Sequence, residues 1–260
     1  MTTSLRRSFA IQRRVIGALV LREVITRYGR HNIGVLWMVV EPMLFTLGIV
    51  AVWGLVGLGK GGNLPLVPLA LTGYTSILMW RNVASRCTSV MRANLALMHH
   101  RNVRVFDMYI GRVILEIGGI LISFVFLLSV FFILGQIDFP ADILNTTLGL
   151  MMLAWFGFAL AMIIGYISEI SEIIDRVWHV MVYLSLPVTG AAWIVEWLPP
   201  DFQAVVLWFP MVHGSELLRH GIFGGAAKFH YDLAYFGAVN GVMTFIGLVL
   251  MRDLTRRVEP

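Results

Sequence analysis

Cysteine and charge are what this 260-residue sequence has least of. Only 13% of its residues are Asp, Glu, Lys or Arg, whereas 58% are hydrophobic. A soluble domain carries about 25% charged residues, so this chain has too little charge to cover a water-exposed surface of its size. The single cysteine, Cys87, excludes an internal disulfide framework. The composition therefore predicts an integral membrane protein.

Long apolar runs account for most of the chain. A membrane-spanning helix takes about 20 apolar residues, and six segments reach that length. The predicted spans cover about residues 33–58, 66–88, 108–135, 143–168, 174–198 and 232–251. The connections are too short to contain a soluble catalytic domain. We therefore expect an all-α integral membrane protein with six transmembrane helices in a single domain over residues 1–260.

Lys and Arg residues gather in alternate connections, and this bias predicts which side of the membrane each connection faces. Seven Arg residues lie in 1–32, three in 89–107 and three in the tail after the last span. By contrast, the first span is followed only by Lys60, and residues 136–142 hold no Lys or Arg. We therefore expect both termini and the 89–107 loop to be cytoplasmic. Because the Arg residues cluster beside apolar spans, the net charge of +5 does not indicate nucleic-acid binding.

The segment before the first span, residues 1–32, has the pattern of an amphipathic helix. Apolar residues recur at i, i+3, i+4 and i+7 from Leu21 to Tyr28, while Arg22, Glu23 and Arg27 fall on the opposite face. Such a helix suits the cytoplasmic surface of the membrane. It would be either a simple anchor or a gate or docking surface for a partner, and the pattern leaves both possibilities open.

The connection 199–231 is unusually long and contains two short apolar helical candidates, split by Pro210. Each is too short to span the membrane, so we expect re-entrant or interfacial half-helices on the extracytoplasmic side, around a cavity. His213, Glu216 and His220 share one helical face there. Their spacing is weak evidence for a metal site, and a hydrogen-bond network at the cavity edge is the preferred interpretation.

A nucleotide site is not expected on this chain. The stretch "GLVGLGKGG" at 54–62 is similar to a phosphate-binding loop, but Gly61 stands where the Mg²⁺-binding hydroxyl is needed. No strand precedes the stretch, and the charge bias places it outside the cytoplasm. The sequence also has no H-E-x-x-H motif, no cysteine pair and no spacing that indicates a nucleophile with its base. We therefore predict no catalytic residue and no metal ligand.

Charged residues within apolar spans are costly, which makes them candidates for function. Arg112 and Glu116 lie four residues apart and are expected to meet on one helix face, as a structural ion pair or a functional one. Glu41 is followed by Pro42, which favours a kink. A structural joint between the surface helix and the first span is preferred there over direct contact with cargo.

Two features of the later spans also carry expectations. Trp155 lies in the middle of the fourth span and would face lipid, pack in the bundle or stack against a sugar. Gly237 and Gly241 form G-x-x-x-G in the last span, a spacing that allows close helix approach within the subunit or at a dimer seam.

Three stretches together resemble a known family: "LREVITRYGRHNIGVLWMVVEP", "ANLALMHHRNVRVFDMYIGRVILE" and "FPMVHGSELLRHGIF". With the order of amphipathic helix, six spans and re-entrant helices, they are similar to type-2 ABC exporter permeases. They closely resemble the inner-membrane permease of Gram-negative capsular polysaccharide export. Members often have Asn-Pro where this chain has Phe209-Pro210, and a proline within 101–106 that is absent here. The matching residues are Arg22, Arg27, Trp37, Glu41, Pro42, Asn94, Asp107, Arg112, Glu116, Pro210, His213, Glu216 and Arg219.

The resemblance implies a homodimer in the bacterial inner membrane, with two ATP-binding cassette subunits that hold ATP and Mg²⁺. It also implies a lipid-linked polysaccharide as cargo and a periplasmic co-polymerase or export adaptor as partner. The loop 89–107, with Asn94, Arg101, Arg104 and Asp107, would contact the ATPase, or its Arg residues would only set orientation. Alternatives are a type-2 permease for O-antigen or teichoic acid, an ion-coupled transporter using Glu41 and Glu116, and an intramembrane enzyme.

Overall fold

The computed structural model describes residues 5–28, 33–56, 64–94 and 103–258. Every regular element within these ranges is helical. The α-helices are α1 (Leu5–Tyr28), α2 (Ile33–Val56), α3 (Leu66–Cys87), α4 (Val90–Asn94), α5 (Val105–Ile133), α6 (Ile143–Ile170), α7 (Glu172–Ser185), α8 (Pro200–Val206), α9 (Pro210–Phe223) and α10 (Leu233–Val258). The all-α prediction is therefore confirmed for the described residues.

Three of these helices are long and apolar enough to cross a membrane: α5, α6 and α10. They correspond to the third, fourth and sixth predicted spans. The residues Met43–Leu55 of α2 form a shorter apolar stretch. Helix α3 coincides with the predicted second span, but it places Thr72, Thr75 and Ser76 in the protein interior. The structure thus supports three apolar spans, while the count of six stays a prediction.

The predicted fifth span, 174–198, is not one continuous helix. Helix α7 ends at Ser185, and a 3₁₀ turn (Leu186–Val188) follows it. Pro187 has no backbone N–H to continue the helix, and Gly190 adopts a φ of 71°, which reverses the chain. The expected loop between α6 and α7 is also shorter than predicted, because Ser171 alone is extended between the two helices.

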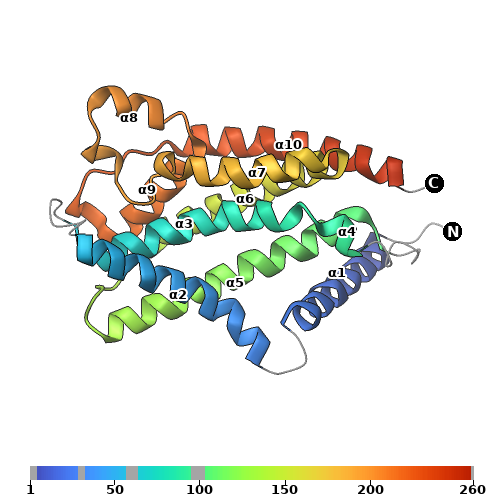
Figure 1. Ribbon diagram of the computed structural model, residues 1–260, viewed down its shortest axis with the longest axis horizontal. Helices are drawn as coiled ribbons and strands as arrows, with labels where there is room; N and C mark the ends of the chain where they lie inside the picture. The colour runs from blue at the N-terminus through green and yellow to red at the C-terminus, as the bar shows by residue number, and fades with distance from the viewer. Residues whose placement is uncertain (1–4, 29–32, 57–63, 95–102, 259–260) are drawn as a thin grey trace.

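The helices lie along one long axis, and the connections sort to its two ends (Figure 1). The start of α1, the end of α10 and α4 lie at one end, and α8 and α9 lie at the other. This arrangement brings together the connections that the charge bias assigns to a common side. Two short helices are present as the sequence predicts: α8 ends at Val206 and α9 begins at Pro210, and their depth in the membrane stays a prediction.

Helix α6 is central because it lacks side chains where it crosses its neighbours. A Cβ atom on Gly157 would lie 2.2 Å from the carbonyl oxygen of Met79 in α3. One on Gly149 would lie 2.7 Å from the backbone nitrogen of Leu218 in α9. The two glycines of the G-x-x-x-G pair in α10 differ. A Cβ on Gly237 would lie 3.8 Å from Met152 Cε of α6, whereas one on Gly241 meets no atom of the described residues within 4 Å, so a dimer seam at Gly241 stays a prediction.

Candidate functional site

The polar face of α1 is tied to α4 and α5 by three side-chain contacts, which we call the α1 junction. Arg22 Nη1 donates to Asn94 Oδ1 over 2.6 Å. Gln12 Nε2 donates to Asp107 Oδ1 over 2.8 Å. Arg112 Nη1 forms an ion pair with Glu23 Oε1 at 2.5 Å. The opposite, apolar face of α1 leaves Leu21 and Ile25 exposed, as an interfacial helix requires.

Burial makes these contacts stronger than ordinary surface pairs. The side chains of Arg112 and Glu23 are only 10% and 20% exposed, and Asp107 is buried. Charges withdrawn from water in this way are poorly screened, so removing one partner leaves the other uncompensated. The Asn94 side chain also has a partner within α4: its Nδ2 donates to the Val90 carbonyl at 2.8 Å, which fixes the last turn of that helix.

In the α1 junction, Arg112 has a partner that the sequence did not predict. The four-residue spacing predicted a pair with Glu116, and Glu116 is buried within α5. The ion pair seen for Arg112 joins it to Glu23, far away in the sequence. Helix spacing reports only neighbours on the same helix, so it could not reveal this contact. Glu23 lay on the polar face of the predicted amphipathic helix, whereas Gln12 had no sequence signal.

The other residues predicted for the cytoplasmic side lie in different surroundings, and their role as a common ATPase contact stays a prediction. Asn94 and Asp107 belong to the α1 junction, and Arg104 is exposed immediately before α5. Arg101 lies outside the described residues, as do the side chains of Arg27, Trp37, Glu41 and Pro42. Helix α2 runs through the Glu41–Pro42 position without a break.

A second cluster, the α9 network, is built on Glu216 and Arg219, which are both fully buried. Glu216 accepts hydrogen bonds from the backbone N–H of Val195 at 3.3 Å and of His230 at 3.0 Å. Arg219 donates to the carbonyl oxygens of Trp193 and Ala191, each over 2.6 Å. Its guanidinium also lies 3.7 Å from the Glu216 carboxylate. These two side chains therefore hold the non-helical segments on either side of α8 and α9.

Burial and neighbouring charges shift the pKa values of the α9 network. Burial raises the pKa of Glu216, and the nearby Arg219 charge opposes that rise. Burial also lowers the pKa of Arg219 to about 10, so its guanidinium stays charged at neutral pH. At the exposed edge, a hydrogen bond from His230 at 2.6 Å lowers the pKa of Glu196. Glu216 and Arg219 thus form hydrogen bonds with backbone groups, and the predicted cavity beside them stays a prediction.

His213 joins the same network in one defined tautomer. Its Nδ1 accepts a hydrogen bond from the Asp232 N–H at 2.9 Å, so that nitrogen carries no proton. Its Nε2 donates to the Leu207 carbonyl at 2.8 Å. His220 donates to or accepts from the Tyr231 hydroxyl at 2.8 Å. His213, Glu216 and His220, whose spacing was weak evidence for a metal site, thus have separate protein partners.

Acidification is expected to weaken this region through His213. Burial lowers the pKa of His213 below its usual 6.5, and protonation would also remove the acceptor for the Asp232 N–H. The unfolded chain then binds more protons below pH 6.5, so unfolding becomes easier as pH falls from there toward the folded pKa. We expect the unfolding temperature in detergent to drop over this window and the drop to shrink in His213→Gln. The exposed His179→Gln is the control; an equal effect would contradict the assignment.

Trp155 connects α6 to α10. Its indole Nε1 donates to Thr244 Oγ1 at 2.9 Å, and Thr244 in turn donates to the Asn240 carbonyl at 2.7 Å. The ring remains 39% exposed. The hydrogen bond between these two apolar spans therefore satisfies the indole N–H of Trp155. The sugar-stacking role stays a prediction.

These features are those of a helical membrane protein: apolar spans, a helix α1 with exposed apolar residues, and a buried junction that ties α1 to the connection between α3 and α5. Residues 14–223 match the model of the ABC-2 type transporter family, and the chain belongs to that family. It is therefore a transport component rather than an enzyme. The family implies that nucleotide is bound on a partner ATPase.

Individual relatives match almost end to end. The chain is 38% identical to the capsule polysaccharide export inner-membrane protein BexB of Haemophilus influenzae, over 99% of this chain and 97% of the relative. It is 39% identical, with the same coverage, to the capsule polysaccharide export inner-membrane protein CtrC of Neisseria meningitidis serogroup B. It is 23% identical to the polysialic acid transport protein KpsM of Escherichia coli, over 95% of this chain and 96% of the relative.

Proposed function

We propose that this protein is the permease subunit of an ATP-driven exporter that moves lipid-linked capsular polysaccharide across the bacterial inner membrane. The observation that carries the proposal is the full-length similarity to capsule polysaccharide export inner-membrane proteins. The working unit is a homodimer with two ATP-binding cassette subunits and a periplasmic export adaptor. Each chain forms one six-span domain with cytoplasmic termini, and α8 and α9 form the re-entrant region.

The α1 junction supports a way for movement of the ATPase to reach helix α1. Helix α4 and the start of α5 flank the 89–107 connection, which in this proposal contacts the ATPase. Movement there carries Asn94 and Arg112, and the buried contacts with Arg22 and Glu23 pass it to α1. Helix α1 then moves as one body with α5 and acts as a gate beside the first span. The Glu41–Pro42 position serves as the joint between α1 and that span.

Deletion of the gene in its capsulated host tests the proposal. We expect loss of surface capsule, restoration by a tagged copy, and co-purification of a Walker-A-containing ATPase with that copy. An intact capsule together with an ATPase-free complex would sink the proposal. Loss of a different surface glycan would instead identify a permease for O-antigen or teichoic acid, and transport driven by an ion gradient without ATP would indicate a secondary transporter.

Rescue by a disulfide tests the role of the α1 junction. Glu23→Gln leaves Arg112 without its counter-ion, and we expect capsule export to fall while ATP hydrolysis continues. A Cβ atom on Gly111 would lie 3.4 Å from Leu19 Cβ, close to disulfide geometry. Adding Leu19→Cys and Gly111→Cys should therefore restore export under oxidising conditions and lose it again on reduction.

The design has its own controls. Either cysteine alone should give no redox-dependent rescue, and Cys87 is buried and does not compete for the new thiols. If the oxidised pair blocks export in the otherwise unchanged protein, α1 separates from α5 during transport, and movement as one body is refuted.

A further inference from the structure

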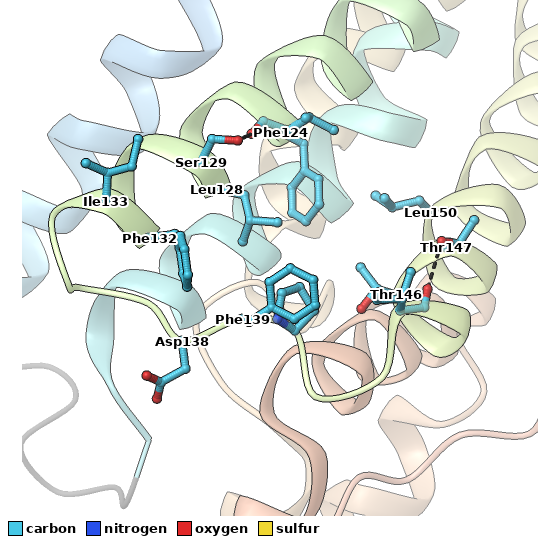
Figure 2. A pocket seen from close by; sticks show the side chains of 13 residues that line it. Phe124, Leu128, Ser129, Phe132, Ile133, Asp138, Phe139, Thr146, Thr147 and Leu150 are labelled. Carbon is cyan, nitrogen blue, oxygen red and sulfur yellow. Dashed lines mark hydrogen bonds between the residues drawn. The ribbon is translucent and has the colours of Figure 1, made fainter.

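A hollow of about 410 Å³ lies between the end of α5 and the start of α6 (Figure 2). Phe124, Leu128 and Phe132 of α5 form one wall, and Leu150 lies on the α6 side. Phe139, from the connection between the two helices, projects into the same space (Figure 2). Its ring packs edge-on against Phe132, with centroids 6.2 Å apart and planes at 74°. We call this space the α5–α6 hollow.

The backbone holds the hollow in shape. The N–H of Gln136 donates to the Phe131 carbonyl at 2.9 Å, and Gly135, at a φ of 67°, turns the chain out of α5. Asp142 closes the connection, because its N–H donates to the Gly221 carbonyl of α9 at 2.8 Å. Its side chain also caps α6 by accepting from the Asn145 N–H at 3.1 Å. The hollow is therefore preformed.

The hydroxyl groups that line the hollow already donate their protons to the backbone. The three hydroxyls in its lining all donate to backbone carbonyls one turn earlier, each at 2.8 Å: Ser129, Thr146 and Thr147. Each ordered water molecule needs two to four polar partners. Apolar side chains make up most of the lining, so hydrocarbon is the better occupant.

The opening of the hollow identifies where that hydrocarbon comes from. Val125, Ile133 and Ile143 line it and are exposed on α5 and α6, two of the apolar spans. Lipid therefore reaches the opening directly, and an acyl chain can enter the hollow from the membrane.

Charge at the mouth favours one kind of lipid. Asp138 is exposed, and it is the one charged residue among the described residues that line the hollow. The segment 113–175, which contains most of α5 and all of α6, has no Lys or Arg. A headgroup with an ammonium complements the negative charge of Asp138.

We propose that the α5–α6 hollow binds one acyl chain of a zwitterionic, amine-bearing membrane phospholipid, with its ammonium near Asp138. The charge bias places this lipid in the extracytoplasmic leaflet. The proposal concerns a resident lipid and does not depend on which glycan is exported.

Photolabelling tests the site. The intact complex is reconstituted into vesicles of equal parts phosphatidylethanolamine and phosphatidylglycerol, with a diazirine on the acyl chain of one or the other. Complexes are then extracted into lipid-free detergent, which strips loosely held lipid, and illuminated. We expect phosphatidylethanolamine to label peptides within 124–150. Val125→Trp should lower this labelling about fifteenfold, the effect of displacing two methylenes. Ile122→Trp, equally exposed on α5 but outside the lining, should not.

Asp138→Asn tests the headgroup. We expect it to abolish the preference for phosphatidylethanolamine over phosphatidylglycerol while acyl labelling of the same peptides persists. The proposal is overturned if labelling is absent, if both tryptophan variants behave alike, or if phosphatidylglycerol labels the unchanged protein equally well. Displacement of the label by purified lipid-linked glycan would assign the hollow to cargo instead. None of these outcomes requires export activity.

Discussion

Replacing Arg219 by methionine is expected to destabilise the protein by about 3–5 kcal/mol, the usual result of removing one partner from a buried ion pair. Glu216 would remain fully buried without its counter-ion, and the carbonyls of Trp193 and Ala191 would lose their donor. The segment that follows α7 would then detach from α9. Thermal unfolding of the purified protein in detergent measures the change.

Two further variants make the Arg219 prediction specific. Glu216→Gln combined with Arg219→Met should recover part of the lost stability, because no charge is then left buried alone. Arg257→Met removes an arginine from an exposed pair with Asp253 in α10 and should cause no measurable change. If Arg219→Met and Arg257→Met unfold at the same temperature, the α9 network does not stabilise the fold.

Gly157→Val is expected to be the second severe change, at about 3 kcal/mol of lost stability. The new Cβ would lie 2.2 Å from the carbonyl oxygen of Met79 and 3.2 Å from the Cα of Trp80. Both are backbone atoms, so no side-chain rotation relieves the overlap, and α3 and α6 must separate. The separation would also loosen the core that α3 and α6 share with α5.

Gly241→Val is the matched control, because it makes the same change in another apolar span. A Cβ there meets no atom of the described residues within 4 Å, so we expect an effect within about 0.5 kcal/mol. The readout is the unfolding temperature of both variants side by side. Equal damage from the two substitutions would show that α3–α6 contact is not what Gly157 protects.

Much of the fold was predictable because hydropathy is a local property. The apolar runs predicted α5, α6 and α10, and the i, i+3, i+4 pattern predicted α1. Pro210 predicted the break between α8 and α9. Composition alone excluded a soluble protein. The motif order also indicated the family to which the chain belongs.

The candidate site was less predictable because its contacts join distant parts of the chain. Periodicity identified Arg22 as a polar-face residue but could not show that it bonds to Asn94. The apolar run through 174–198 predicted a span, although Pro187 and Gly190 end the helix early. The spacing of His213, Glu216 and His220 predicted hydrogen bonding, but His213 and Glu216 bond to backbone groups that no side-chain pattern reveals.

The sequence by itself determined that this is a helical membrane protein of a transporter family, since burial of apolar surface depends on composition and on spacing along each segment. Only the tertiary structure decided the pairing of Arg112 with Glu23, the contact of Gly157 with α3 and the hollow between α5 and α6. Each of these depends on how separate helices pack. Packing is decided by the shapes of surfaces that meet only in the folded chain.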